Sequence, residues 1–196
     1  MTLPPDWRSR IPWVFLVLAA VALTVQLQPG WRAAWLYDRA AVMEGEWWRL
    51  WSGHWVHFGW PHFVADAGLF LILGVLLERP HRRMVFAALA FMPPGIGLVL
   101  LSLDPTMAHY GGLSALNLGL LLFLALQGWQ RNWRDWFWPA VLVIYVGEIV
   151  FEILTGGTGG GMIRFDDPNV RVATSAQMAG AADARGVWGW GGWRPR

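Results

Sequence analysis

The chain has 196 residues, of which 56% are hydrophobic and 14% charged, and it contains no cysteine. Its mean hydropathy of +0.38 is higher than a soluble domain of this size tolerates, so the composition favours lipid as the solvent. The missing cysteine excludes disulfides, thiolate nucleophiles and thiolate metal ligands. The net charge of +2, carried on dispersed arginines, argues against nucleic acid as a partner.

Five apolar runs each come close to the roughly 20 residues that a helix needs to cross a bilayer. They occupy residues 11–28, 60–77, 84–103, 111–128 and 138–154. A sixth candidate, 170–190, is weaker because Asp183 and Arg185 interrupt it, each at a cost of about 2.5–3.5 kcal/mol in mid-membrane. We therefore expect one all-α membrane domain over residues 1–196, a polytopic bundle of about six transmembrane helices whose first run is a retained span.

Two segments between the runs have the composition of extramembrane chain. Residues 31–58 mix charged side chains with several tryptophans, which prefer the headgroup level, so we expect this interfacial segment to lie on the membrane surface. Residues 155–169 begin with a nearly continuous glycine run and predict a flexible loop outside the membrane. The paired prolines Pro93 and Pro94 should be tolerated in a span where neighbouring groups satisfy the carbonyls that they free.

The arginines indicate how the chain is oriented. Seven of them fall on one side of the membrane if the amino terminus is cytoplasmic, namely Arg8, Arg10, Arg79, Arg82, Arg83, Arg131 and Arg134. Short cytoplasmic loops carry an excess of basic residues. We therefore expect an integral, multi-pass protein of a plasma membrane with its amino terminus inside.

Polar side chains inside spans are expensive and are therefore candidates for function. The fourth run opens with Gly111-Gly112-Leu113-Ser114-Ala115, in which the Ser114 hydroxyl lies beside small residues and helix-terminal N–H groups that could stabilise an oxyanion. The alternative is that these small residues only allow close helix packing, with Ser114 bonded to its own helix.

Three histidines and one carboxylate cluster around the start of the second run. His62 and Asp66 are four residues apart and share one helix face, while His54 and His57 precede them closely. Three neighbouring imidazoles also allow a metal site, although no clean ligand spacing with a carboxylate is present. Glu148 and Glu152 form a further pair in the fifth run, for which a solvated or arginine-paired role is the simpler interpretation.

These motifs together resemble the rhomboid intramembrane serine proteases over about residues 44–180. The resemblance rests on Gly-Glu-Trp-Trp-Arg at 45–49, His62 with Asp66, Gly-Leu-Ser at 112–114 and Ala-Gly at 179–180. Ser-Gly-His-x-Val-His at 52–57 and Tyr-Gly-Gly-Leu-Ser at 110–114 look most like the bacterial rhombosortase branch. That branch implies a rhomboid-type bundle in the bacterial inner membrane, with membrane lipids around it and carboxy-terminal tails of exported proteins as substrates.

The resemblance also implies roles for individual residues. Ser114 corresponds to the nucleophile, and His62 to the histidine that polarises the oxyanion. The expected general base is a histidine on the last span, where this chain has Gln177, and an amide cannot accept a proton at neutral pH. Asp66 stands where the family has asparagine, so it either faces the oxyanion or orients His62. Ala115 replaces the usual glycine after the serine.

Three hypotheses follow. The first is a rhomboid-like serine protease without metal or other cofactor, and catalytically weak because Gln177 replaces the base. The second is a noncatalytic rhomboid-like protein that binds transmembrane segments of client proteins. The third is a metal-dependent membrane enzyme that uses His54, His57 and His62.

Overall fold

The structure is a computed structural model that describes residues 11–154 together with Met178, Gly180 and Ala182. It is mostly helical, as the sequence predicts. The elements in chain order are α1 (Trp13–Leu27), α2 (Pro29–Trp35), β1 (Tyr37–Asp38), α3 (Arg39–Met43), α4 (Arg49–Ser52), the 3-10 helix η2 (Gly53–Trp55), α5 (Trp60–Leu77), α6 (Arg82–Leu103), β2 (His109–Tyr110), α7 (Ser114–Arg131) and α8 (Phe137–Leu154).

All five clear apolar runs form helices. The second run and α5 have the same bounds, and α1, α6 and α8 begin and end within two residues of the prediction. Helix α7 begins three residues later than its run does, because the two glycines that open the run belong to a turn. Most of the sixth run, 170–190, and the whole loop 155–169 lie outside the described residues.

Within the described residues, α5 and α6 are each long and apolar enough to cross a membrane. A third span results if α1 and α2, which meet at a bend of 113°, are taken as one broken span. The total of about six spans therefore stays a prediction. Large apolar side chains on the outside of these helices, such as Val64, Ile72 and Phe91, are exposed, as expected for surfaces solvated by lipid.

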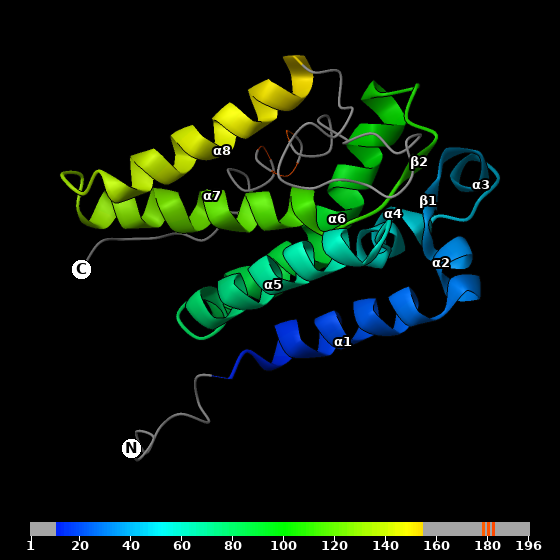
Figure 1. Ribbon diagram of the computed structural model, residues 1–196, viewed down its shortest axis with the longest axis horizontal. Coiled ribbons are helices and arrows are strands. Elements are labelled where there is room, and N and C mark those ends of the chain that lie inside the picture. The colour runs from blue at the N-terminus through cyan, green and yellow to red at the C-terminus, as the bar shows by residue number, and fades with distance from the viewer. Residues whose placement is uncertain (1–10, 155–177, 179, 181, 183–196) are drawn as a thin grey trace.

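Helix α5 is the centre of the bundle, packing against α1 on one side and α7 on the other (Figure 1). Phe15 of α1 and Phe70 of α5 are fully buried, and their rings lie 4.4 Å apart. Helix α7 also packs against α8, while α6 packs against α4 of the interfacial segment. The chain thus folds the interfacial segment back onto the ends of its spans.

A two-residue antiparallel ladder joins the interfacial segment to the start of α7. Tyr37 pairs with Tyr110 and Asp38 with His109, and the two tyrosine rings meet edge to face at 6.5 Å. Both tyrosines are buried. This ladder fixes the turn before α7 against the segment that carries His54 and His57.

Helix α6 continues through its two prolines, and at the first of them a distant side chain replaces the missing donor. Pro93 has no N–H to give to the carbonyl of Leu89, four residues earlier. The indole Nε1–H of Trp51 donates to that carbonyl at 3.2 Å. The expectation that neighbouring groups satisfy a freed carbonyl is confirmed at this position.

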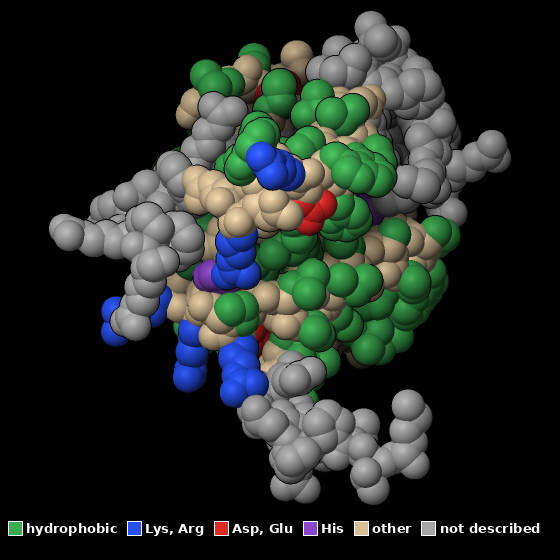
Figure 2. All heavy atoms as spheres, turned by 90° about the vertical axis from the view of Figure 1, so that its left-hand side faces the viewer, with side chains coloured by type: hydrophobic (Ala, Val, Ile, Leu, Met, Phe, Trp, Pro, Cys, Tyr) green, Lys and Arg blue, Asp and Glu red, His purple; other side chains and the backbone are tan. Residues whose placement is uncertain are grey.

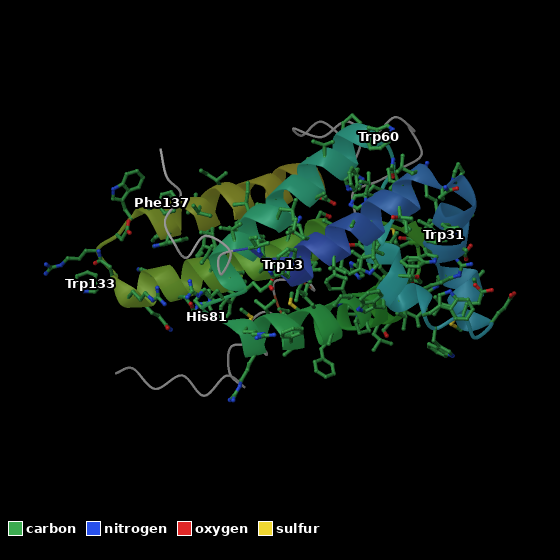
Figure 3. All side chains as sticks on the ribbon, turned by 90° about the horizontal axis from the view of Figure 1, so that it is seen from below. Trp13, Trp31, Trp60, His81, Trp133 and Phe137 are labelled. Atoms are coloured by element: carbon green, nitrogen blue, oxygen red, sulfur yellow. The ribbon has the colours of Figure 1, made fainter. Side chains whose placement is uncertain are left out.

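The two ends of the bundle differ in charge. Five arginines lie in or next to the turns that follow α5 and α7, namely Arg79, Arg82, Arg83, Arg131 and Arg134, and Figure 2 shows basic side chains gathered at this end. The β1–β2 ladder and the short helices lie at the opposite end (Figure 1). In Figure 3, Trp31 and Trp60 mark that opposite end, while His81, Trp133 and Phe137 mark the arginine end. Tryptophans at both ends suit two membrane interfaces.

Candidate active site

The amino end of α7 is shaped by Gly112, which has a φ of +122°. A side chain is strained in this conformation. It would also have no room, since a Cβ there would lie 2.8 Å from the His62 ring and 3.1 Å from Asp66 Oδ2. Gly112 therefore lets the chain turn directly over the His62–Asp66 pair, and Ser114 begins α7 two residues later.

Asp66 bridges α5 and α7. Its Oδ2 accepts a hydrogen bond from the Leu113 backbone N–H at 2.8 Å, and its backbone carbonyl accepts one from Asn117 Nδ2 at 2.9 Å. The side chain is buried. A carboxylate at the amino end of a helix is favoured by the helix dipole and by the unpaired N–H groups there. Asp66 thus occupies the position at which α7 would bind an anion.

Two histidines converge on the same carboxylate oxygen. His62 Nε2 lies 3.1 Å and His57 Nε2 3.4 Å from Asp66 Oδ2, and the two imidazole rings meet edge to face at 5.1 Å. His62 Nδ1 accepts from the Phe58 N–H at 3.4 Å, so Nε2 carries the ring proton and donates it to Asp66. The expected pairing of His62 with Asp66 is thus present in the structure, and His57 joins it.

A second buried polar cluster lies on the other side of Gly112. His54 Nε2 lies 3.0 Å from the Pro93 carbonyl of α6, and His54 Nδ1 lies 3.4 Å from the Tyr110 hydroxyl. The same hydroxyl donates to the Gly112 carbonyl at 3.0 Å. Burial lowers the pKa of His54, which keeps its imidazole neutral at neutral pH.

Ser114 is half-buried at the first position of α7. Ser114 lies next to the Asp66 cluster, since the Leu113 N–H that Asp66 accepts belongs to the residue before it, and Tyr110 of the second cluster stands four residues earlier in the chain. Chemically, the site combines a primary hydroxyl, a pair of ring N–H donors and the amino end of a helix.

The sixth apolar run reaches this site through Gly180, one of its described residues. Gly180 is buried against α7, where an added Cβ would collide with the Ala115 carbonyl. Gln177 lies outside the described residues, as do the side chains of Glu148 and Glu152. The assignment of Gln177 to the position of the general base therefore stays a prediction.

The five histidines do not form a common metal site in the described part of the chain. No group of three or more histidine, aspartate or glutamate side chains there is arranged to hold a metal ion. His54 is bonded to Pro93 and Tyr110, away from the Asp66 carboxylate that His57 and His62 share. His109 is exposed and lies 3.4 Å from Asp38.

The sequence did not predict that the Tyr110 hydroxyl lies between His54 and Gly112. In the sequence Tyr110 stands out only as part of the Tyr-Gly-Gly-Leu-Ser motif. Its position four residues before Ser114 was the only available signal, because the two-residue strand that turns it toward His54 is too short to predict.

Comparison with known families gives one match. A profile of the Rhomboid domain matches residues 44–184, which is well over half of the chain. The match begins at Glu44 and includes Trp47, Trp48 and Trp51 of the interfacial segment, both buried clusters, Ser114 and Gly180. No curated protein matches the sequence.

Proposed function

The chain belongs to the rhomboid family, and on that premise we propose that it is a rhomboid-like intramembrane serine protease. It is an integral membrane protein with apolar, lipid-exposed helices. The reaction is hydrolysis of a peptide bond within or beside a membrane segment of an exported protein, with Ser114 as nucleophile. The observation that carries the proposal is that Ser114 begins α7 directly beside the His62–Asp66 pair of α5.

The rhombosortase branch narrows this function to cleavage of carboxy-terminal sorting tails in a bacterial inner membrane. The motifs Ser-Gly-His-x-Val-His and Tyr-Gly-Gly-Leu-Ser support it. Residues from both motifs meet at the site, since His54 of the first approaches Tyr110 of the second at 3.4 Å. Tail segments would enter from the lipid, where the helices expose apolar side chains.

Two features of the site predict weak activity. Gln177 stands where the family has its base, and loss of one triad member in soluble serine proteases leaves only about 10³- to 10⁴-fold catalysis over water. The Asp66 carboxylate holds the Leu113 N–H and the His62 Nε2–H, which are donors that an oxyanion would need. A negative charge at this position opposes the charge that develops in the transition state.

The same contacts favour a second candidate, a noncatalytic protein that binds transmembrane segments of its clients. Asp66 satisfies the amino end of α7 without a substrate. A purely structural role for Asp66 therefore explains this contact without any catalytic reaction. In this case a client segment crosslinks to the protein equally well in the wild type and in Ser114→Ala.

The deciding experiment compares wild type, Ser114→Ala and Gln177→His in detergent and in liposomes. Labelling by a serine-directed fluorophosphonate and cleavage of a model transmembrane substrate are both measured. For a protease we expect slow labelling of the wild type, none of Ser114→Ala, and a sharp rise in both readouts for Gln177→His. If no variant is labelled or cleaves while client crosslinking persists, the noncatalytic function replaces the protease.

A further inference from the structure

The arginine end of the bundle carries positive charge that is not neutralised within the described part of the chain. Glu78 and Asp135 lie at this end, but both carboxylates accept from backbone N–H groups at helix starts, those of Val14 and Phe15 for Glu78 and that of Phe137 for Asp135. Among the described residues, four exposed arginines of this end form no ion pair, namely Arg82, Arg83, Arg131 and Arg134.

Two of the turns at this end are held together by His81. Its Nδ1 lies 3.4 Å from Gln127 Nε2, and its ring meets the Phe123 ring edge to face at 5.4 Å. Arg82 follows His81 as the first residue of α6, and Arg131 is four residues after Gln127, on the same face of α7. Burial lowers the pKa of His81, and so does the positive charge of Arg131. Cations from α6 and α7 therefore flank one contact.

Aromatic rings place these cations at the depth of lipid headgroups. Arg82 Cζ lies 5.6 Å from the centre of the Phe86 ring, and Arg134 Cζ lies 5.1 Å from that of the Trp133 ring. Exposed tryptophans of the same end, which prefer the headgroup level, are Trp129, Trp133 and Trp136. A guanidinium stacked on a ring keeps its N–H edge available, and that edge matches two oxygens of a phosphate.

We propose that Arg82, Arg83 and Arg131 bind the phosphate of an anionic phospholipid at this membrane interface. The amino end of α6, which has no side-chain cap, adds the positive end of a helix dipole. Figure 2 looks onto this end and shows the basic side chains spread over it, open to a ligand. The proposal is independent of Ser114, so it holds for a protease and for a noncatalytic protein alike.

Two observations favour a lipid over a soluble anion, and an anionic headgroup over a zwitterionic one. Arg83, Phe86 and Ala90 are all exposed and follow each other at helical spacing on α6, so an apolar face continues from the arginines into the bilayer for the acyl chains. A zwitterionic headgroup carries an ammonium that the arginines would repel, whereas an anionic headgroup brings net negative charge to them.

The test uses the full chain in a nonionic detergent, to which dioleoylphosphatidylglycerol or dioleoylphosphatidylcholine is added. Native mass spectrometry measures the affinity for each lipid, and tryptophan fluorescence follows the thermal midpoint. The variants are Arg131→Gln and the triple variant Arg82→Gln, Arg83→Gln, Arg131→Gln. Arg32→Gln is the matched control, because Arg32 also lies in the last turn of its helix but at the opposite end of the bundle.

We expect phosphatidylglycerol to bind more tightly than phosphatidylcholine and to raise the thermal midpoint of the wild type. Its affinity should fall by about fivefold in Arg131→Gln and by at least about 30-fold in the triple variant, while Arg32→Gln keeps wild-type affinity. Inorganic phosphate at millimolar concentration should neither displace the lipid nor raise the midpoint, because it gains nothing from the apolar face of α6.

Three results would overturn the proposal. Unchanged affinity in the triple variant would mean that these arginines do not hold the lipid. An equal loss in Arg32→Gln, or equal binding of both lipids, would reduce the effect to general attraction between lipid and protein. Displacement by inorganic phosphate would make the site one for a free anion. If the triple variant does not fold, Arg82→Gln, Arg83→Gln and Arg131→Gln are compared singly with Arg32→Gln on the same criteria.

Discussion

Asp66 Oδ2 lies 2.8 Å from the backbone nitrogen of Leu113, the residue immediately before the proposed nucleophile. This hydrogen bond ties α5 to α7 and places a carboxylate where the helix dipole attracts negative charge. The arrangement stabilises the resting protein. The carboxylate also fills the position that an oxyanion would take. Asp66 therefore stabilises the fold but disfavours the catalytic transition state.

We predict that Asp66→Asn increases reactivity at Ser114 and decreases stability. The amide removes the negative charge and adds an N–H donor, so fluorophosphonate labelling should rise by about tenfold, in line with one donor of an oxyanion site. Loss of the charged bond to Leu113 and His62 should cost about 1–2 kcal/mol in the free energy of unfolding. Labelling rates and denaturation in the same detergent measure the two effects.

Asp135→Asn is the matched control for this substitution. Asp135 also accepts from a backbone N–H at a helix start, that of Phe137 at 3.1 Å, but it lies in the turn between α7 and α8 at the far end of the bundle. Asp135→Asn should lower the free energy of unfolding without raising the rate of fluorophosphonate labelling. Equal or slower labelling in Asp66→Asn would mean that the carboxylate supports the reaction.

The sequence predicts the long helices well, because each clear apolar run forms a helix close to its predicted bounds. It also predicts the pairing of His62 with Asp66, since residues four apart on a helix share a face. It cannot predict contacts that depend on tertiary packing. His54 meets Pro93 and Tyr110 across 39 and 56 residues.

The first residue of α7 was also not predictable from the sequence. Hydropathy extends the run to Gly111, whereas the helix begins at Ser114. Gly112 has a positive φ, and a Cβ there would meet the His62 ring, a contact that no local pattern records. The sequence therefore predicts which residues belong to the site. It does not predict that His57 and His62 gather around Asp66 while His54 contacts Tyr110.

A second prediction concerns Glu78, which stabilises the start of α1 from 64 residues away. Its carboxylate accepts from the Val14 N–H at 3.1 Å and the Phe15 N–H at 3.4 Å, and α1 has no side-chain cap of its own at Pro12. Glu78→Ala should cost about 1–2 kcal/mol in the free energy of unfolding. Hydrogen exchange should show faster exchange of the two amides.

Glu44→Ala serves as the control, because Glu44 is exposed at the opposite end of the bundle. It should change neither stability nor exchange at Val14. Unchanged protection of Val14 and Phe15 in Glu78→Ala would show that this contact does not hold α1 in place.

The orientation of the bundle gives a third prediction. Because the native chain has no cysteine, single cysteines can be placed without background. Arg82→Cys, at the arginine end, should react with a membrane-impermeant maleimide only from the cytoplasmic side, and Ala34→Cys, in exposed α2, only from the outer side. Spheroplasts and inverted vesicles provide the two sides. Labelling of both positions from the same side would contradict the topology.

The last prediction tests how α6 tolerates Pro93. Trp51→Phe removes the indole N–H that serves the Leu89 carbonyl and should cost about 1–2 kcal/mol, because a buried carbonyl loses its partner. In a Pro93→Ala background the backbone N–H gained at position 93 can bond to the same carbonyl, so the cost of Trp51→Phe should shrink by about 1 kcal/mol. The carbonyl at position 93 is retained, so the contact with His54 is not disturbed. Trp48→Phe, an exposed tryptophan in the same segment, should show no coupling to Pro93→Ala. A double-mutant cycle of unfolding free energies measures the coupling, and a value near zero for the Trp51 pair would show that the indole N–H does not replace the donor that proline removes.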